Sequence, residues 1–406
     1  MFYLQISHPV AKIKLSYICI NNMVTLNANI LFEAGGAPIT VIKQQGTDLF
    51  FVLQNGLIYR QATGLFVNIQ SRVLYTNFSE IGLLGLAFHP TDILRFFLWF
   101  SEKPNNPPAG FDHINRLEEW RIVGGVPQRA VTLLRLPNPT TVHNGNNNIY
   151  YDQPTNRLIL ATGDGGNSSF AQQDNQLFGK IIAINVDDPV WLTNENNTPI
   201  TQVSQLGIFA SAITVVSKGI RNPTRIDQKG GIMFLSVAGQ SSQEFAFAFR
   251  DYSSKNFGWR AFEGPIPTLS GTTVSFPTEV IQLLNENLLW EPTVHYANSA
   301  AAGLPPNVFS GNAISGIDYY QAPGPITALD NNLIFTDLSG QIFQMPLHQS
   351  TSEIVLQISQ PIQKITVNNL SGSFTTMFIT STKRILVAHF IVVNNYIVAR
   401  ISELTQ

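Results

Sequence analysis

Three short polar segments lie between apolar runs and carry side chains suited to chemistry. His143-Asn144-Gly145 places an imidazole in a tight turn, and the ordinary pKa of histidine suits proton transfer near neutral pH. Arg221-Asn222-Pro223 supplies a planar guanidinium, which can bind carboxylate or carbonyl oxygens through several donors. An arginine that only holds backbone carbonyls between sheets is an equally good interpretation. Asp164, in Gly163-Asp164-Gly165-Gly166, is expected to cap backbone amides of its own turn.

The elements that must position these segments are short strands that recur along the chain. They are rich in Val, Ile, Phe, Leu and Thr, the linkers are rich in Asn, Gly, Pro and Ser, and no segment sustains a 3.6-residue apolar period. About six units are recognisable: Ile39–Ile42, Asp48–Leu53 and Gly56–Arg60; Gly82–His89 and Arg95–Ser101; Asn148–Tyr151, Arg157–Gly163 and Gly179–Asn185; Thr224–Asp227 and Gly231–Ala238; Ile326–Ala328, Asn332–Thr336 and Gln341–Met345; Thr376–Thr380, Arg384–Phe390 and Tyr396–Ile401.

This recurrence predicts an all-β protein and, more specifically, a six-bladed β-propeller. A pair of β-sandwiches is the alternative, but sandwich strands do not usually repeat one motif around a whole chain. The 406 residues would otherwise suggest two or three domains. We expect instead a single propeller domain over residues 30–406, preceded by an N-terminal extension, residues 1–29, outside the core fold.

Composition excludes several classes of protein. Charged residues are only 12% of the chain, the net charge is −2, and no basic run could neutralise a row of phosphates, so we expect no nucleic-acid partner. The single cysteine, Cys19, excludes an intramolecular disulfide or a multi-thiolate metal site. No apolar stretch is long enough for a membrane span, and no secretory signal is visible. The abundant neutral polar residues favour an extracellular or particle-surface setting, and the sequence leaves the oligomeric state open.

Four segments in order carry a resemblance to a known family. They are Gly82-Leu-Leu-Gly-Leu-Ala-Phe-His89-Pro90, His143-Asn144-Gly145 with the Gly-Asp-Gly-Gly turn, Gly219-Ile-Arg221-Asn222-Pro223, and Asn256-Phe-Gly258-Trp259. Together they resemble the glucose/sorbosone dehydrogenase family over about residues 30 to 400. Members of this family are soluble quinoprotein sugar dehydrogenases, six-bladed propellers that use pyrroloquinoline quinone (PQQ) and calcium.

The resemblance implies roles for individual residues. His143 matches the base that takes the hydroxyl proton while hydride leaves the same sugar carbon for the quinone. Arg221 and Asn222 match cofactor contacts, and Lys364 is the one cation in the late stretches where quinone-active members supply a lysine and paired arginines. The backbone carbonyls of Gly239 and Gln240 match the calcium loop.

Departures from the family pattern support a second hypothesis. Ile81 replaces a polar residue next to Glu80, Val142 replaces an aspartate before the base, and Glu244 is half of the usual acidic pair. A tricarboxylate cofactor needs opposite charge that much of this chain lacks. The sequence therefore predicts either an aldose-like sugar dehydrogenase or a catalytically degenerate propeller that binds a glycan or a protein, or that serves as a structural protein of a particle surface.

Overall fold

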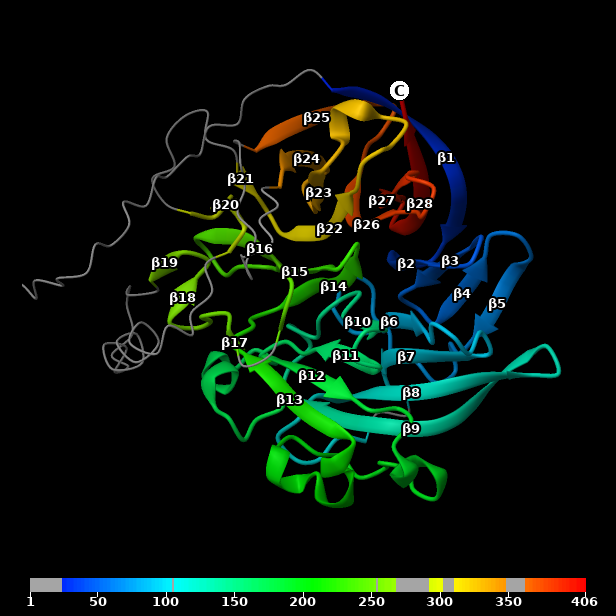
Figure 1. Cartoon of the computed structure of the whole chain (residues 1–406), viewed down its shortest axis with the longest axis vertical. Helices are drawn as coiled ribbons and strands as arrows, with labels where there is room; N and C mark the ends of the chain where they lie inside the picture. Colours follow the sequence, from blue (N-terminus) through cyan, green and yellow to red (C-terminus); the bar gives the residue numbers. More distant parts are fainter. Residues whose placement is uncertain (1–23, 104–105, 253–254, 268–291, 302–309, 348–361) are drawn as a thin grey trace, which may run out of the picture.

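The computed structural model describes residues 24–103, 106–252, 255–267, 292–301, 310–347 and 362–406. Within these ranges the regular structure consists of strands and short 3₁₀ helices, so the expected all-β class is confirmed. The sheets are arranged around a centre in the manner of a propeller (Figure 1). None of the helices in the described ranges is long and apolar enough to cross a membrane.

Four sheets contain four or five strands, each paired antiparallel to its neighbour except that β17 and β21 add in parallel at an edge. The first sheet has β2 (Ile39–Gln45), β3 (Asp48–Leu53), β4 (Leu57–Arg60) and β5 (Gly64–Asn68), and the second has β6 (Leu83–Phe88), β7 (Arg95–Ser101), β8 (His113–Val123) and β9 (Val126–Asn138). The third has β10 (Ile149–Asp152), β11 (Arg157–Ala161), β12 (Lys180–Ile184), β13 (Ile213–Lys218) and β17 (Lys255–Asn256). The fourth has β14 (Pro223–Lys229), β15 (Ile232–Val237), β16 (Gln243–Phe249), β20 (Val294–Asn298) and β21 (Ser310–Gly311).

An eight-stranded sheet completes the arrangement, beside a two-stranded one of β18 (Phe262–Glu263) and β19 (Ile266–Pro267). Its order is β22-β23-β24-β25-β1-β28-β27-β26, with β22 (Ile314–Tyr320), β23 (Asn332–Asp337), β24 (Gln341–Pro346), β25 (Gln363–Asn368), β26 (Ser373–Ile379), β27 (Ile385–Val393) and β28 (Tyr396–Thr405). The first described strand, β1 (Thr25–Gly35), pairs antiparallel with β28 and parallel with β25. β1 begins inside the segment that we expected to be an extension. Its pairing with β28 places an N-terminal and a C-terminal strand side by side in one sheet.

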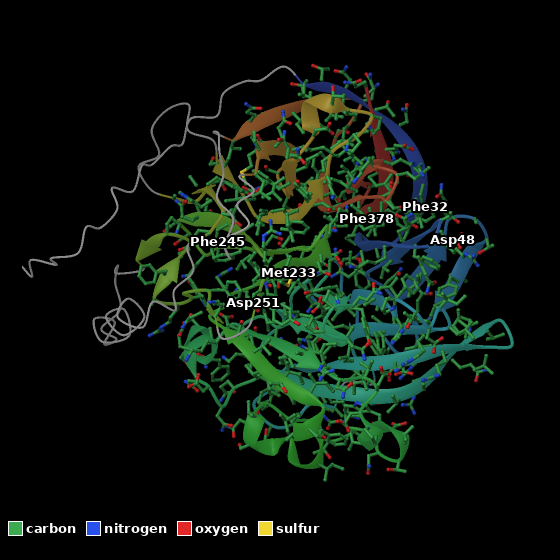
Figure 2. The ribbon with its side chains drawn as sticks, in the orientation of Figure 1. Phe32, Asp48, Met233, Phe245, Asp251 and Phe378 are labelled. Atoms are coloured by element: carbon green, nitrogen blue, oxygen red, sulfur yellow. The ribbon has the colours of Figure 1, made fainter. Side chains whose placement is uncertain are left out.

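The middle strands are apolar on both faces because each sheet packs between two others. Every residue of β7, Arg95-Phe-Phe-Leu-Trp-Phe-Ser101, is buried, which is the pattern of a strand covered on both sides. Between the third and fourth sheets, Met233 and Phe245 belong to one apolar cluster, and both are labelled in Figure 2. Hairpin turns use residues that tolerate positive φ: Asn394 and Asn395, both at positive φ, form the two-residue connection from β27 to β28.

The first strand of each sheet unit lies near the centre (Figure 1). Around this centre β2 contacts β6, β6 contacts β10, β10 contacts β14, β14 contacts β22, β22 contacts β26, and β26 contacts β2. Because strands alternate in direction, the loop that enters a first strand and the loop between the second and third strands lie at the same edge of their sheet. Loops of these two kinds carry the polar segments identified in the sequence.

One predicted strand is wrong. Residues expected to form a strand at Ile326–Ala328 lie instead at the 3₁₀ helix η5 (Thr327–Leu329), and the strand that pairs with β23 is β22. β22 was missed because Ser315, Gly316 and Asp318 interrupt its apolar pattern. The insert Pro189–Gln205 contains the 3₁₀ helices η2 (Pro189–Leu192) and η3 (Val203–Gln205), whereas much of the insert Glu263–Gly311 lies outside the described residues, as do residues 104–105 of the insert Pro104–Asp112.

Candidate functional site

A histidine–aspartate pair forms the centre of the site. His143 lies in the loop before β10 and Asp164 in the loop after β11, and His143 Nδ1 is 2.5 Å from Asp164 Oδ1. The aspartate side chain is fully buried, whereas the histidine side chain is 15% exposed. A carboxylate oxygen accepts, so in the neutral ring Nδ1 carries the proton and Nε2 keeps its lone pair. The pair therefore presents a proton acceptor whose orientation is fixed.

Asp164 is itself held by two donors. Gly166 N donates to Oδ1 at 2.9 Å, and the indole Nε1 of Trp259 donates to Oδ2 at 2.7 Å. The first of these is the amide cap expected from the Gly-Asp-Gly-Gly turn. The contact with His143 was not expected, and it makes Asp164 a positioning residue for the histidine as well as a turn residue.

Glu80, in the loop before β6, connects the segments. Its Oε2 accepts hydrogen bonds from His143 N at 2.5 Å, from Asn144 N at 3.3 Å and from Asn222 Nδ2 at 3.1 Å. The amide oxygen of Asn222 in turn accepts from Gly145 N at 3.3 Å. One carboxylate thus brings together the loops that enter β6, β10 and β14, and with them His143 and Asn222.

Arg221 lies beside this pair and meets protein groups on two sides. Its NH1 donates to Ala238 O at 3.0 Å, and its guanidinium carbon is 5.5 Å from the centroid of the Trp259 ring. Burial lowers the pKa of Arg221, and nearby carboxylates, Asp164 first among them, act in the opposite direction. The sequence left two roles open for Arg221, and the contact with the Ala238 carbonyl corresponds to the structural one. This contact uses NH1 of the guanidinium.

Close backbone approach explains a glycine next to the aspartate. A Cβ at Gly163 would lie 1.9 Å from His143 O and 3.2 Å from Arg221 O. Asp164 N also donates to Arg221 O at 2.8 Å. The His143 and Arg221 loops therefore close onto the Gly163 backbone, and only glycine leaves room for them.

The loop that contains Gly239 and Gln240 turns its amides toward carboxylates. Glu263 Oε1 accepts from four successive amides, those of residues 240 to 243, at 2.6 to 3.2 Å. Gly239 N donates to Glu244 Oε2 at 3.2 Å, and burial raises the pKa of Glu244 to about 8. In the described part of the chain, His, Cys, Asp and Glu side chains form no group of three or more that could hold a metal ion. Calcium binding through the carbonyls of Gly239 and Gln240 stays a prediction.

Lys364 does not join the other predicted residues. It lies on β25, far along the sheet from the inner strand β22, and its side chain is exposed. Its Nζ is 3.3 Å from Gln341 Oε1. The structure therefore brings together His143, Arg221 and Asn222, with Gly239 in the loop beyond Ala238, and leaves Lys364 on an outer strand.

Several buried polar atoms near this site have no hydrogen-bond partner among the described residues. Among the described residues, Arg221 Nε and both polar atoms of the Asn147 side chain are buried without a hydrogen-bond partner, and Asn147 is fully buried. Asn147 N donates to Leu84 O, and its own carbonyl accepts from Ile226 N, so it lies between β6 and β14 near the centre. Such atoms need a partner with donors and acceptors of its own.

The charges of the site do not fit a tricarboxylate such as PQQ. The carboxylates that act on Arg221 are those of Asp164, Glu263, Glu80 and Glu244. Because burial keeps Glu244 protonated near neutral pH, the three carboxylates of the cofactor would meet those of Asp164, Glu263 and Glu80 beside Arg221. The segments outside the described ranges at 268–291, 302–309 and 348–361 contain no Lys or Arg in the sequence.

Sequence reasoning missed two members of the site. Glu80 was noted only as the neighbour of a lost polar residue, although it binds both predicted loops, and Trp259 was expected only to turn and pack the chain. A signal was present for each, since Glu80 precedes the Gly-Leu-Leu-Gly segment and Trp259 ends the last of the four segments. Neither spacing could show that these residues reach Asp164 and His143.

Comparison with solved structures identifies the class of fold. A putative oxidoreductase (glucose dehydrogenase) from Thermus thermophilus superposes with a TM-score of 0.62 at 16% identity, covering 94% of this chain and 100% of that one. The PQQ-bound aldose sugar dehydrogenase of Streptomyces coelicolor gives 0.59 at 17% identity, covering 94% and 98%. The soluble aldose sugar dehydrogenase of Escherichia coli, in its apo form, gives 0.58 at 13% identity, covering 94% and 99%. The chain has the fold of the soluble sugar dehydrogenases.

No family model matches the sequence, and no curated protein sequence matches it.

Proposed function

We propose that this protein is a sugar dehydrogenase-like oxidoreductase that acts on a CH–OH group of an aldose-like sugar. The observation that carries the proposal is the contact between His143 and Asp164, with the histidine partly open and the aspartate fully buried. The proton of the sugar hydroxyl passes to His143 Nε2, while Asp164 holds Nδ1–H and stabilises the imidazolium that forms. Trp259 and Gly166 keep the carboxylate in place as the charge moves.

We also infer that the ring has six blades and that residues 30–406 form one domain. The supporting observation is the closed series of contacts among β2, β6, β10, β14, β22 and β26. In this interpretation the eight-stranded sheet is two blades, β22 to β25 and β26 to β28 with β1, joined by the parallel pairing of β25 and β1. Closure of the ring by strands from both ends of the chain is a way in which propellers protect their sheet edges.

The site residues differ from the pattern of the family in the electron acceptor that they could bind. Hydride leaving the sugar carbon needs a two-electron acceptor, and the PQQ expected from the resemblance carries three carboxylates. Among the described residues, the Nε–H of Arg221 has no partner, and it could donate to one anionic or carbonyl oxygen, which suits a quinone with at most one carboxylate.

A second candidate function is carbohydrate binding without turnover. The observation that favours it is the same set of carboxylates near Arg221, those of Asp164, Glu263 and Glu80, because this arrangement disfavours the family's cofactor but not a sugar. Carboxylate oxygens and Asn147 would accept and donate hydrogen bonds to hydroxyl groups. The two candidates share the sugar and differ in whether a hydride leaves it.

The experiment measures sugar binding and dye reduction on the same preparations. A panel of aldoses is titrated by calorimetry, and dye reduction is then followed with calcium and either PQQ or a monocarboxylate quinone. For the dehydrogenase we expect turnover that falls by about 10²–10⁴-fold in His143→Ala, with Arg400→Gln, a surface variant on β28, unchanged. Sugar binding with no turnover under any acceptor would select the second candidate, and no sugar binding would refute both.

A further inference from the structure

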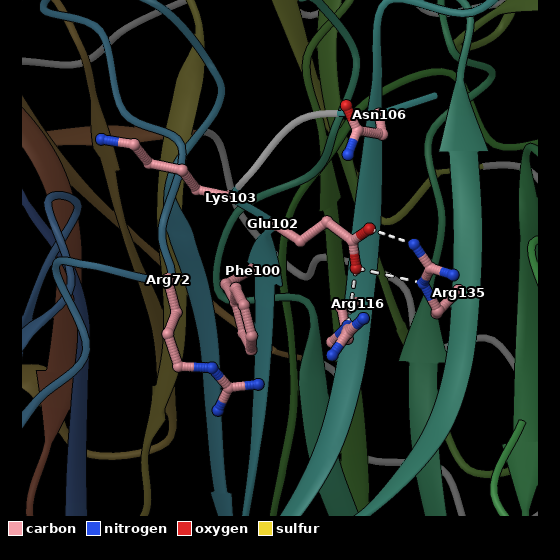
Figure 3. A pocket seen from close by; sticks show the side chains of 7 residues that line it. All are labelled: Arg72, Phe100, Glu102, Lys103, Asn106, Arg116 and Arg135. Atoms are coloured by element: carbon pink, nitrogen blue, oxygen red, sulfur yellow. Dashed lines mark hydrogen bonds and ion pairs between the residues drawn. The ribbon is translucent and has the colours of Figure 1, made fainter. Parts of the chain in front are cut away.

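A cavity of about 230 Å³ lies on the sheet of β6 to β9, outside the site described above. It is formed by Arg72 in the segment before β6, by Phe100 on β7 with Glu102, Lys103 and Asn106 beyond it, and by Arg116 on β8 and Arg135 on β9 (Figure 3). The residues that line it are Arg72, Phe100, Glu102, Lys103, Asn106, Arg116 and Arg135.

Arginines and glutamates alternate along this cavity. Arg72 NH2 is 2.6 Å from Glu118 Oε1, and Arg116 NH1 is 3.2 Å from the same atom. Arg116 Nε is 2.6 Å from Glu102 Oε2, and Arg135 binds both oxygens of Glu102, with its Nε 3.1 Å from Oε2. The series runs Arg72, Glu118, Arg116, Glu102, Arg135, and Figure 3 shows Glu102 between the two arginines that hold it. Each guanidinium is fixed by a carboxylate.

The cations of this cavity are more exposed than the carboxylates that bind them. The side chains of Glu118 and Glu102 are 0% and 7% exposed, whereas those of Arg72, Arg116 and Arg135 are 30%, 20% and 17% exposed. Glu118 is not among the lining residues, whereas Glu102 lines the cavity together with Arg116 and Arg135, which bind it. With Lys103, which also lines the cavity, four cations stand against two carboxylates in a chain whose net charge is −2.

Arg72 is held so that donors remain available. Its guanidinium lies 5.5 Å from the ring centroid of Trp120 and 5.7 Å from that of Phe100, and one hydrogen bond, from NH2 to Glu118, engages it among the described residues. A guanidinium has five N–H donors, so several are left for a ligand. Because packing and ion pairing already fix the side chain, little rotamer freedom is lost when a ligand binds.

We propose that this cavity binds a tetrahedral oxyanion of the kind found in phosphate monoesters, where it carries up to two negative charges, and in sulfate esters, where it carries one. Forked guanidinium donors match its oxygens, and the local excess of two positive charges suits its negative charge. The cavity is several times the share of liquid volume of one water, about 30 Å³, so the oxyanion enters with part of the molecule that carries it. Nothing in the proposed sugar site requires this cavity, and the two proposals can fail independently.

The experiment titrates the full chain with oxyanions at constant ionic strength. Inorganic phosphate and sulfate are the primary probes, acetate and chloride the monovalent controls. Glucose 6-phosphate and a sulfated oligosaccharide then distinguish a small phosphorylated carrier from a sulfated glycan. We expect the dianions to bind in preference to the monovalent controls, and the tightest of the four probes to identify the carrier.

Two variants of opposite effect and one control assign the binding to this cavity. Arg72→Gln should weaken oxyanion binding about tenfold or more. The variant should still fold, because Glu118 keeps its ion pair with Arg116 and accepts a hydrogen bond from Trp120 Nε1 at 3.1 Å. Glu102→Gln removes the negative charge that Arg116 and Arg135 share within the cavity and should tighten binding severalfold. Arg129→Gln, a pair with Glu195 outside the lining residues, should change nothing. No dianion binding to folded wild type, or equal loss in Arg72→Gln and Arg129→Gln, would overturn the proposal.

Discussion

Replacing Asp318 with alanine should destabilise the protein by removing the carboxylate that joins several first strands. Asp318 lies on β22 with 1% of its side chain exposed. Its Oδ1 is 2.7 Å from Lys229 Nζ, and its Oδ2 is 3.2 Å from Arg225 NH2 and accepts from Ile379 N at 2.8 Å. Arg225 and Lys229 belong to β14, and Ile379 ends β26, so one carboxylate links three neighbouring strands of the ring.

The magnitude follows from what the substitution leaves behind. Arg225 keeps Asp227 at 3.0 Å, and Lys229 keeps the carbonyl of Ile379, so neither cation is stripped of all partners. Breaking a buried ion pair from one side typically costs about 3–5 kcal/mol, and we expect the lower end, about 3 kcal/mol. For a chain of this length that corresponds to a fall in Tm of about 3–6 °C. The free energy of unfolding is measured by urea denaturation at pH 7, with Tm from calorimetry.

A double variant separates charge from packing. Asp318→Leu combined with Lys229→Met removes a carboxylate and a cation together and should cost less than Asp318→Ala alone, because fewer buried charges are left unpaired. Glu403→Ala, on the outer pair of β27 and β28 with its carboxylate a quarter exposed, is the control and should cost about 1 kcal/mol or less. A cost below about 1 kcal/mol for Asp318→Ala would refute the view that this carboxylate holds the inner strands together.

Three further predictions concern the proposed sugar site and the loop beside it. Gly163→Ala should abolish sugar binding and lower Tm, because a Cβ would collide with His143 O; a variant with wild-type Tm and affinity would contradict the packing described for that loop. Trp259→Phe removes the donor to Asp164 at 2.7 Å, and it should reduce turnover about tenfold while leaving sugar affinity nearly unchanged in calorimetry. Burial raises the pKa of Glu244 to about 8, so the folded state favours its protonated form. The contribution of Glu244 to the free energy of unfolding is complete below about pH 4.5 and is lost as the pH rises through 8. The corresponding slope of the unfolding free energy against pH should be absent in Glu244→Ala.

The strands could be predicted because each carries its own local signal. Asp48–Leu53 and Arg95–Ser101 are strands with the predicted bounds, since apolar β-branched and aromatic runs end at turn residues. The outer strands of the sheets are harder to recognise. β25, Gln363-Lys-Ile-Thr-Val-Asn368, alternates polar and apolar residues, and only its pairing with β24 and β1 makes it a strand of this sheet. The assignment of Lys364 to the cofactor relied on its position in the sequence alone. The structure places it on β25, an outer strand of the sheet.

The site could be predicted in part, for a related reason. His143 and Asn222 were recognisable because a turn motif surrounds each. Glu80 and Trp259 depend on which loops meet in space, and that is decided by the ring of first strands and not by any local pattern. Glu80 lies 63 positions before His143, and 142 before Asn222, yet it bonds to both. A contact over such a separation leaves no period or spacing in a single sequence.

The placement of charge also decides which ligand suits the proposed sugar site. The chain has few charged residues, and many of its cations are used in buried ion pairs. Lys43 is paired with Asp227 at 2.7 Å, and Arg95 is paired with Glu119 at 2.8 Å. Few cations are therefore left to bind a ligand. At the proposed sugar site the carboxylates of Glu80 and Asp164 instead act on a single arginine, Arg221. A like charge about 4 Å from a carboxylate costs about 1 kcal/mol in water and about 4 kcal/mol at an effective dielectric of 20. A hydroxyl group at the same distance donates a hydrogen bond to the carboxylate and gains from it. The arrangement that disfavours a tricarboxylate therefore favours a neutral, hydroxyl-rich ligand, which is the chemistry of a sugar.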